Sequence, residues 1–597
     1  MFGPLYLFFY LIAPFAARQV VAIWPAPQSF SNGTSVLWLA RNFHVNYDVL
    51  HVQPSLRPGH EDEDVNEEIL STGDFSSHSI VQAAISRALD TLWKHSLVPW
   101  KLHARNQLSA FEPAKESSSS SRKQYIKSLR IIQSSVDTAS TFKPRAGEVD
   151  ESYSLKVSLD GTARITAVSP IGVLHGLETF VQLFYKHSSG SGIYTNLAPV
   201  DITDAPIFPH RGLNMDVARN WFPVSDILRT IDALSMNKFN RLHIHMTDSQ
   251  SWPLDVPALP ELAQKGAYQT GLSYSPADFK KMQTYAVEHG VEMIVEFDMP
   301  GHTSSIGYAY PDLVAGFDAR PWDTYCNEPP CGSLKLNSPE VSAFLNTLFS
   351  DVLPRVQPYS AYFHTGGDEV NKQVYLLDDT VQSNDSLLIG SLIQKMVDRN
   401  HDQIRKAGMT PIVWEEMLLE WGLTLGSDVL VQSWLSDESV AQITGKGHKV
   451  VTGNYHYWYL DCGKGQWLNF RNGNSFQKYY PFKDYCDPFH NWRLVYSYDP
   501  LAGVPANQTH LVMGGEVHIW SEQTDPVNLD DMVWPRASAA GEVLWSGRQD
   551  AGGQNRSQID ASPRLAEMRE RMVSRGIGAG PVQMVFCTQS DAAECSL

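Results

Sequence analysis

Positive charge is scarce in this sequence. Its 597 residues include 47 Lys and Arg against 65 Asp and Glu, so the formal net charge is −18 at pH 7. A chain with this balance offers no strongly basic surface to a phosphate backbone or to an anionic lipid leaflet. We therefore expect no nucleic-acid partner and no membrane partner.

Long hydrophobic runs are missing after the first 22 residues. The opening stretch, 1–22, is apolar and ends in small residues, which is typical of a secretory signal peptide. The alternative is a membrane anchor, but Pro14, Arg18 and Gln19 interrupt the run before the ~20 residues that a spanning helix needs. The sequence thus predicts a secreted, extracellular protein whose signal peptide is removed.

Cysteine is rare, with six in the chain, but the number is even and the residues fall in local pairs. An oxidising compartment favours disulfides, and each local pair would close a short loop. We predict the pairs Cys326–Cys331, Cys462–Cys486 and Cys587–Cys595. Sequons for N-glycosylation, which fit a secreted protein, occur at Asn32, Asn384, Asn507 and Asn555.

The first part of the chain has a mixed pattern. Residues 23–201 combine short β-like runs, such as 153–159, with helical stretches, such as 80–92, and predict a small α+β domain. Within this part, KESSSSSRK at 115–123 is a Ser-rich linker that cannot bury surface. It is either a solvated loop or a processing site, and in the second case residues 23–121 form a propeptide.

The second part, 205–597, changes to apolar β-branched runs that alternate with amphipathic helices. This pattern is typical of parallel strands covered by crossover helices. The expected strands are 212–216, 241–247, 291–297, 362–366, 411–415, 429–433, 449–453 and 511–515. Eight strand–helix units predict an α/β fold, a (β/α)8 TIM barrel with a C-terminal extension.

Carboxylates and aromatic rings follow these strands, while a catalytic Lys, a phosphate loop and a nucleophile elbow are missing. In such a barrel the chemistry takes place at the carboxyl ends of the strands. The sharpest element is HTGGDEV, 364–370, where two glycines let the backbone approach a ligand and Asp368 and Glu369 leave a strand end. We expect a carbohydrate site there.

Several motifs together resemble one enzyme family. They are HRGLNMDVARNWFP (210–223), LHIHMTDSQSWP (242–253), EFDMPGHTSS (296–305), HTGGDEV (364–370), VVTGNYHYWYLD (450–461), GGEVHIWSEQTD (514–525) and WPRASAAGEVLWS (534–546). In this order they closely resemble glycoside hydrolase family 20, and specifically the secreted fungal-type β-N-acetylhexosaminidases. The resemblance covers about residues 205 to 550.

This resemblance implies the catalytic roles. Glu369 would be the general acid/base, and Asp368 would hold and polarise the 2-acetamido group of the substrate, whose oxygen acts as the nucleophile. Tyr459 would donate a hydrogen bond to the acetamido carbonyl. Asp248 and His302 would form a supporting pair close to Glu369.

The resemblance also implies the substrate-binding residues. Three tryptophans would wall the sugar, and one arginine and two carboxylates would bind its ring hydroxyls: Trp414, Trp434, Trp520, Arg211, Asp461 and Glu522. Arg211 could instead pair with Glu542 or Asp216. The family often has two acidic residues where this chain has Asp248-Ser249, so the carboxylate that partners His302 stays open.

We therefore expect an exo-acting β-N-acetylhexosaminidase that releases terminal GlcNAc, and in some substrates GalNAc, from chitooligosaccharides and glycoconjugates. It would need no cofactor and no metal, and it would be a homodimer. Three alternatives remain: a disaccharide-releasing member of the family, a catalytically dead chitin-binding protein, and a metal-dependent amidohydrolase. The last rests on the H-x-H of His243 and His245, because alternate residues of a strand face one side.

Overall fold

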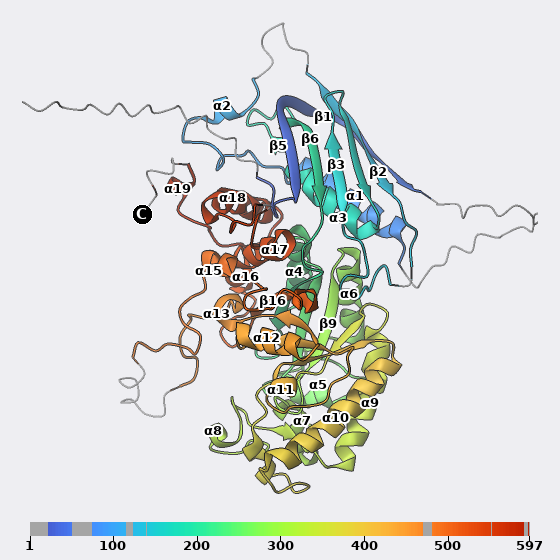
Figure 1. The fold of residues 1–597 in the computed structure, drawn as a ribbon, viewed down its shortest axis with the longest axis vertical. Helices are drawn as coiled ribbons and strands as arrows, with labels where there is room; N and C mark the ends of the chain where they lie inside the picture. Colours follow the sequence, from blue (N-terminus) through green and yellow to red (C-terminus); the bar gives the residue numbers. More distant parts are fainter. Residues whose placement is uncertain are drawn as a thin grey trace, which may run out of the picture.

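A computed structural model describes residues 22–50, 75–114, 123–138, 140–469, 480–550, 552–589 and 595. The predicted signal peptide, apart from Ala22, and the Ser-rich linker, apart from Lys123, lie outside these residues. Figure 1 shows two parts: an N-terminal sheet with its helices and, below it, a barrel. Among the described helices, none is both long and apolar enough to span a bilayer.

The N-terminal part is a six-stranded sheet with its two long helices on one face, as the α+β pattern predicts. Its strands are β1 Ser29–Val49, β2 Tyr125–Gln133, β3 Tyr153–Val157, β4 Thr162–Ala167, β5 Tyr185–Lys186 and β6 Ile193–Asp204, in the order β1-β2-β4-β3-β6-β5. The helices are α1 Ser77–Lys94, α2 Leu108–Phe111 and α3 Pro170–Gln182. Alternate strand residues such as Leu129 and Ile131 share one buried cluster with Ile80 of α1 and Val173 of α3.

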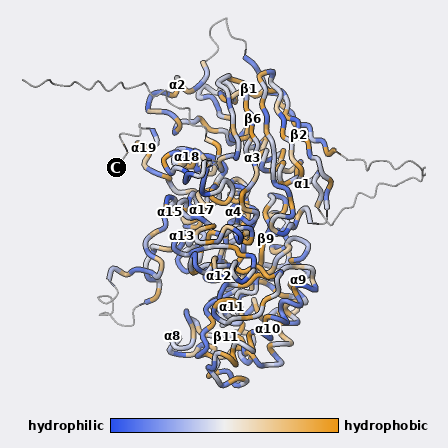
Figure 2. The backbone as a smooth tube through the Cα atoms, in the orientation of Figure 1, coloured by the Kyte–Doolittle hydropathy of each residue, from blue (hydrophilic) through white to orange (hydrophobic). Residues whose placement is uncertain are grey.

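The second part is a closed barrel of eight parallel strands, which confirms the predicted TIM barrel. The strands are β7 His210–Asp216, β8 Arg241–Thr247, β9 Glu292–Phe297, β12 Tyr362–His364, β13 Thr410–Trp414, β14 Leu430–Ser433, β15 Lys449–Thr452 and β16 Val512–Ile519. Nearly every strand residue is buried, because side chains fill the barrel inside and helices cover it outside. Each expected strand overlaps an observed one. Figure 2 shows hydrophobic segments running through the interior, around β9.

Helices surround the barrel and begin where their capping residues predict. The longer ones are α4 Val224–Met236, α6 Pro276–Glu288, α9 Pro339–Val356, α10 Ser386–Lys406, α12 Asp437–Gly445, α17 Arg536–Ser546 and α18 Gln558–Ser574. Ser275 caps α6 by accepting a hydrogen bond from the backbone N–H of Asp278, and a proline follows at the first helical position. Ser338 caps α9 in the same way.

Shorter elements occupy the connections between the strands and helices. The short helices are α5 Glu261–Gly266, α7 Ser304–Gly307, α8 Trp322–Tyr325, α11 Glu416–Leu419, α13 Tyr455–Trp458, α15 Trp492–Ser497, α16 Leu529–Val533 and α19 Val585–Gln589. Single 3-10 turns lie at Pro311–Leu313, Lys372–Leu376 and Thr509–Leu511, and β10 Val314–Ala315 pairs with β11 Ser333–Leu334. Many of these elements follow barrel strands, so they shape the end of the barrel where chemistry is expected.

The two parts are joined through buried polar contacts. Lys238, between α4 and β8, binds Asp204 at the end of β6 at 2.9 Å, and both side chains are fully buried. Trp24 is fully buried as well and donates its indole N–H to the carbonyl of Ser538 in α17 at 3.1 Å. The first described segment, around Trp24, is thus packed into the barrel.

The three predicted disulfides are present: Cys326–Cys331, Cys462–Cys486 and Cys587–Cys595. The four sequon asparagines, Asn32, Asn384, Asn507 and Asn555, are all exposed. They are therefore accessible to glycosylation, although occupancy stays a prediction.

Candidate active site

A cleft of about 380 Å³ opens at the carboxyl ends of the barrel strands. It brings together most of the predicted site residues, namely His302, Asp368, Glu369, Trp434, Tyr459, Asp461, Trp520 and Glu522. They come from loops after different strands, which shows that a common end of the barrel gathers residues far apart in sequence.

Asp368 and Glu369 are carried by a loop that only glycines can form. Gly366 follows β12 with φ +66°, and a Cβ there would lie 1.9 Å from Oδ1 of Asp298. The backbone N–H of Gly367 donates to that same oxygen at 2.8 Å. Glu369 itself has φ +52°, a strained value for a residue with a side chain. The loop is thus held so that both carboxylates reach the cleft.

A chain of polar contacts runs from Glu369 into the barrel. Nε2 of His302 lies 3.4 Å from Oε2 of Glu369, and its Nδ1 lies 3.1 Å from Oδ1 of Asp248. Burial opposes a charge on His302, but the nearby carboxylates, Asp248 first, raise its pKa well above the usual value. Asp248 is therefore the nearest carboxylate to Nδ1 of His302, and Glu328 is next at 3.4 Å. A protonated imidazole lies beside Glu369.

Aromatic side chains form the walls of the cleft. The rings of Trp434 and Tyr459 are nearly parallel, with centroids 6.1 Å apart, and Trp520 lies against Tyr459. Trp414, the last residue of β13, does not line the cleft. It is 1% exposed and packs in the layer beneath, where its indole N–H donates to Oε1 of Glu296 at 2.7 Å. It still packs in one cluster with Tyr459, Trp520 and Trp434, so its predicted contact with the sugar stays a prediction.

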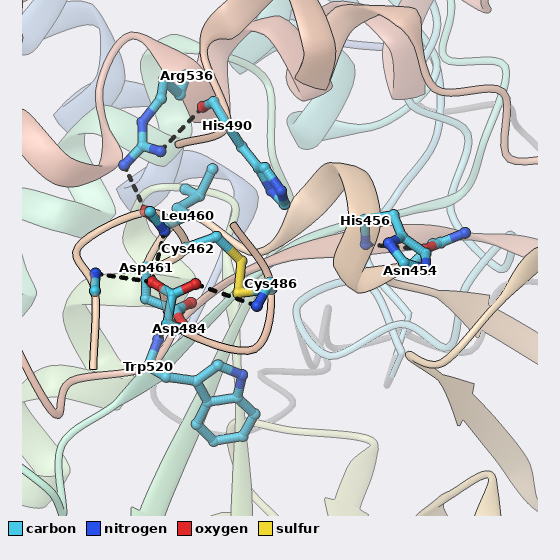
Figure 3. The surroundings of a disulfide bond; sticks show 12 residues. Asn454, His456, Leu460, Asp461, Cys462, Asp484, Cys486, His490, Trp520 and Arg536 are labelled. Carbon is cyan, nitrogen blue, oxygen red and sulfur yellow. Dashed lines mark hydrogen bonds between the residues drawn. A yellow bond between two sulfur atoms is a disulfide. The ribbon is translucent and has the colours of Figure 1, made fainter. Parts of the chain in front are cut away.

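Two carboxylates lie at another side of the cleft. Asp461 precedes the Cys462–Cys486 disulfide and lies close to the backbone N–H of Trp520 (Figure 3). Burial raises the pKa of Asp461 to about 7. Burial also raises the pKa of Glu522, although the charge of Arg219 opposes the shift. These carboxyl groups are available to exchange hydrogen bonds with sugar hydroxyls.

The structure does not place Arg211 in the cleft. Arg211 is the second residue of β7, at the opposite end of the strand, and it is fully buried. Its guanidinium forms two hydrogen bonds with Glu151 of the N-terminal part and one with the carbonyl of Lys238. The expected role of Arg211 at the sugar is therefore wrong, as is its alternative pairing with Glu542 or Asp216. Strand direction explains the result. Arg211 lies near the amino end of β7, whereas the cleft lies at the carboxyl ends of the strands.

Among the described residues, Arg219 is the arginine that lines the cleft. It follows the carboxyl end of β7 and contacts Asp248 at 3.0 Å, and its Nε donates to Glu328 at 3.1 Å. The prediction missed both residues. The signal for Arg219 was its place after the strand, in the same motif as Arg211. The signal for Glu328 was its position among the four residues between Cys326 and Cys331.

The H-x-H pair lies inside the barrel, below the cleft. His243 contacts Glu516 and Glu296 at 2.9 and 3.0 Å, and His245 contacts Glu296 and Asp248 at 2.6 and 2.7 Å. Burial opposes protonation, but these carboxylates raise the pKa of His243 to about 9 and that of His245 well above its usual value. Each ring is thus held between two buried carboxylates beneath the cleft.

Comparisons with known proteins agree with this geometry. The description "Glycosyl hydrolase family 20, catalytic domain" matches residues 208–548, and "beta-acetyl hexosaminidase like" matches residues 23–183. A Beta-hexosaminidase of Arthroderma benhamiae is 40% identical, over 97% of this chain and 98% of its own length. A Chitooligosaccharidolytic beta-N-acetylglucosaminidase of Ostrinia furnacalis is 34% identical, over 74% of this chain and 75% of its own.

Solved structures of other proteins have the same fold. An exo beta-N-acetylglucosaminidase from Vibrio harveyi, 21% identical, superposes with a TM-score of 0.70 over 96% of this chain and 80% of the other. The family model covers the whole barrel and its cleft, which leaves no support for the amidohydrolase alternative. The chain belongs to glycosyl hydrolase family 20.

Proposed function

We propose that this protein is an exo-acting β-N-acetylhexosaminidase that releases terminal non-reducing GlcNAc from chitooligosaccharides by a retaining, substrate-assisted mechanism. The observation that carries the proposal is the adjacent pair Asp368 and Glu369 in one cleft, with Glu369 backed by His302 and Asp248. A protein that only binds chitin needs no such chain behind a carboxylate. The names and folds of the relatives support the same substrate class.

Glu369 serves as the general acid and then as the general base. It protonates the glycosidic oxygen as the bond to the anomeric carbon breaks, and later takes a proton from the incoming water. The acetamido oxygen attacks the anomeric carbon from the opposite face, so an oxazolinium ring forms and water opens it with overall retention. His302, protonated beside Glu369, orients the carboxyl and stabilises its negative charge once the proton has left.

Asp368 and Tyr459 act on the acetamido group. The carboxylate of Asp368 accepts the acetamido N–H and balances the positive charge of the oxazolinium, and the phenol of Tyr459 donates to the acetamido oxygen. Tyr459 is 2% exposed, and burial raises the pKa of its phenol well above the usual value, so it stays a donor. Trp434 and Trp520 cover the apolar faces of the sugar, with Trp414 supporting them from beneath.

A thiazoline analogue of GlcNAc tests the mechanism. Its fused ring resembles the oxazolinium, so it should bind far more tightly than GlcNAc, as mimics of transition states and intermediates do. The measurement is the inhibition constant against a chromogenic N-acetylglucosaminide. Binding no tighter than that of GlcNAc would argue against assistance by the substrate.

Matched changes at two arginines test which of them binds the sugar. Lys keeps the charge but loses the planar fork, so Arg219→Lys should lower kcat/KM by ~10 to 10²-fold, the effect of about 1.5–3 kcal/mol for one charged hydrogen bond. Arg211→Lys should lower the free energy of unfolding by about 1.5–3 kcal/mol and leave KM unchanged, because Arg211 lies outside the cleft, where it contacts Glu151, neighbouring backbone carbonyls and the ring of Trp545. Steady-state kinetics and thermal melts of both variants would decide. If KM rose in Arg211→Lys and not in Arg219→Lys, Arg211 rather than Arg219 would be the arginine that binds the sugar.

Substrate range is a further part of the proposal. Glu522, Asp461 and Arg219 line the cleft and would bind the ring hydroxyls of the sugar. Small differences in their positions would decide the preference between GlcNAc and GalNAc. Product analysis on chitobiose and on a GalNAc glycoside, side by side, would separate these activities. It would also detect the disaccharide-releasing alternative, which gives no monosaccharide. Assembly as a homodimer stays a prediction.

Secretion and processing complete the proposal. Three disulfides and four exposed sequons are consistent with an extracellular protein. Cleavage near Arg122-Lys123 would leave the upstream fragment bound without a disulfide link, since it contains no cysteine. Its strand β1 pairs with β2 and β6, and Trp24 is buried in the barrel. Denaturing gels of secreted protein should show two pieces that co-elute under native conditions. A single chain starting near Ile23 would contradict processing.

A further inference from the structure

Asp298 is a buried carboxyl group beside the catalytic pair, and no role above uses it. It follows the last residue of β9 and is 2% exposed. Its Oδ1 accepts the backbone N–H of Gly367 at 2.8 Å. Because a Cβ at Gly366 would lie 1.9 Å from this oxygen, the loop can approach Asp298 only through a glycine. Asp298 therefore anchors the segment that ends in Asp368.

Two carboxyl oxygens in this contact have no donor. Oδ2 of Asp298 and Oδ1 of Asp368 are both buried, and within the described part of the chain neither accepts a hydrogen bond from an N–H group or a hydroxyl. One carboxyl oxygen of Asp298, one carboxyl oxygen of Asp368 and one ring nitrogen of His302 all lie within 4.8 Å of one another. Two ionised carboxylates this close would repel, so one of them holds a proton.

The surroundings decide which carboxyl is protonated. Burial and the charge of Asp368 raise the pKa of Asp298 well above its usual range. Burial raises the pKa of Asp368 too, but the charge of His302 and the hydrogen bond from Asp298 oppose that shift. The other charged groups that face the pair are Glu296 beneath it, Glu369 beside it and Glu416 after β13. Asp298, the deeper of the two, is the acid.

We propose that Asp298 is a positioning residue whose protonated carboxyl donates a hydrogen bond to Oδ1 of Asp368. The bond fixes the rotation of the Asp368 carboxylate and leaves its other oxygen for the acetamido N–H. It also keeps the negative charge on Asp368, where the oxazolinium needs it. Asp298 neither gains nor loses a proton during turnover. This inference rests on the proposed role of Asp368.

Infrared difference spectroscopy tests the protonation state without any substrate. Subtracting the spectrum of Asp298→Asn from that of the parent protein at neutral pH should reveal one protonated-carboxyl C=O band. Asp248→Asn is the matched control, because the positive groups around Asp248 hold its pKa well below the usual value despite burial, and it should lose an ionised-carboxylate band instead. Loss of an ionised-carboxylate band in Asp298→Asn would overturn the proposal, whether or not the protein is a hexosaminidase.

Kinetics test the positioning. Asn can still accept from Gly367 and donate to Asp368, and it replaces one neutral group with another. Asp298→Asn should therefore keep kcat within about tenfold of the parent value and leave both limbs of the pH profile in place, whereas Asp298→Ala should lose ~10² to 10³-fold. A shift of either limb by a full pH unit in the Asn variant, or equal losses in Asn and Ala, would overturn the proposal. Should the Ala variant not fold, the Asn profile and its spectrum decide alone.

Discussion

Replacing Glu369 with Gln is expected to lower the turnover of chitobiose by ~10² to 10⁴-fold, and that of an activated aryl N-acetylglucosaminide by much less. A poor leaving group departs only when its oxygen is protonated, and Gln cannot supply the proton. An activated phenol leaves as the anion and needs no proton, so its release depends little on the general acid. The comparison needs kcat for both substrates on the same preparation.

A surface carboxylate provides the control for Glu369→Gln. Glu420, after α11, is exposed and lies outside the cleft, so Glu420→Gln should leave both rates unchanged. The acid role of Glu369 would be lost if its variant slowed the two substrates equally. His302, at 3.4 Å, should then be examined as an alternative proton donor, since its pKa is raised by the carboxylates around it against the effect of burial.

Asp368→Asn is expected to lose ~10² to 10³-fold in kcat while the fold is kept, because it removes a charge that is needed only when the acetamido group becomes cationic. Its effect on stability should be neutral or favourable. Burial raises the folded-state pKa of Asp368 above the unfolded value, so the ionised carboxylate costs stability at pH values above its pKa, and a neutral Asn removes that cost. Kinetics and thermal melts at neutral pH measure the two effects.

The same substitution on the surface separates chemistry from general damage. Asp402 of α10 pairs with Lys406 and its side chain is 59% exposed, so Asp402→Asn should change neither kcat nor the melting temperature appreciably. If Asp368→Asn retained the parent kcat, the acetamido group would not be held by this carboxylate. A large fall in melting temperature would mean that the charge of Asp368 stabilises the fold, contrary to the direction of its pKa shift.

The sequence by itself determined the architecture and the centre of the site. Short apolar, β-branched runs located all eight barrel strands, because parallel strands that are buried on both faces are apolar along their whole length. Local spacing located the three disulfides. The HTGGDEV segment identified Asp368 and Glu369, since its glycines and its place after a strand are both local properties.

Only the tertiary structure decided which side chains meet. Arg211 and Arg219 share one motif, yet β7 carries Arg211 to the N-terminal part and delivers Arg219 to the cleft. Trp414 ends β13, and only the closed barrel brings its indole N–H to Glu296 of β9. The contact between Asp298 and Asp368 was likewise invisible in the sequence. It depends on the pairing of β9 with β12, and the burial and repulsion that set their protonation arise only when the closed barrel brings the two carboxyl groups together.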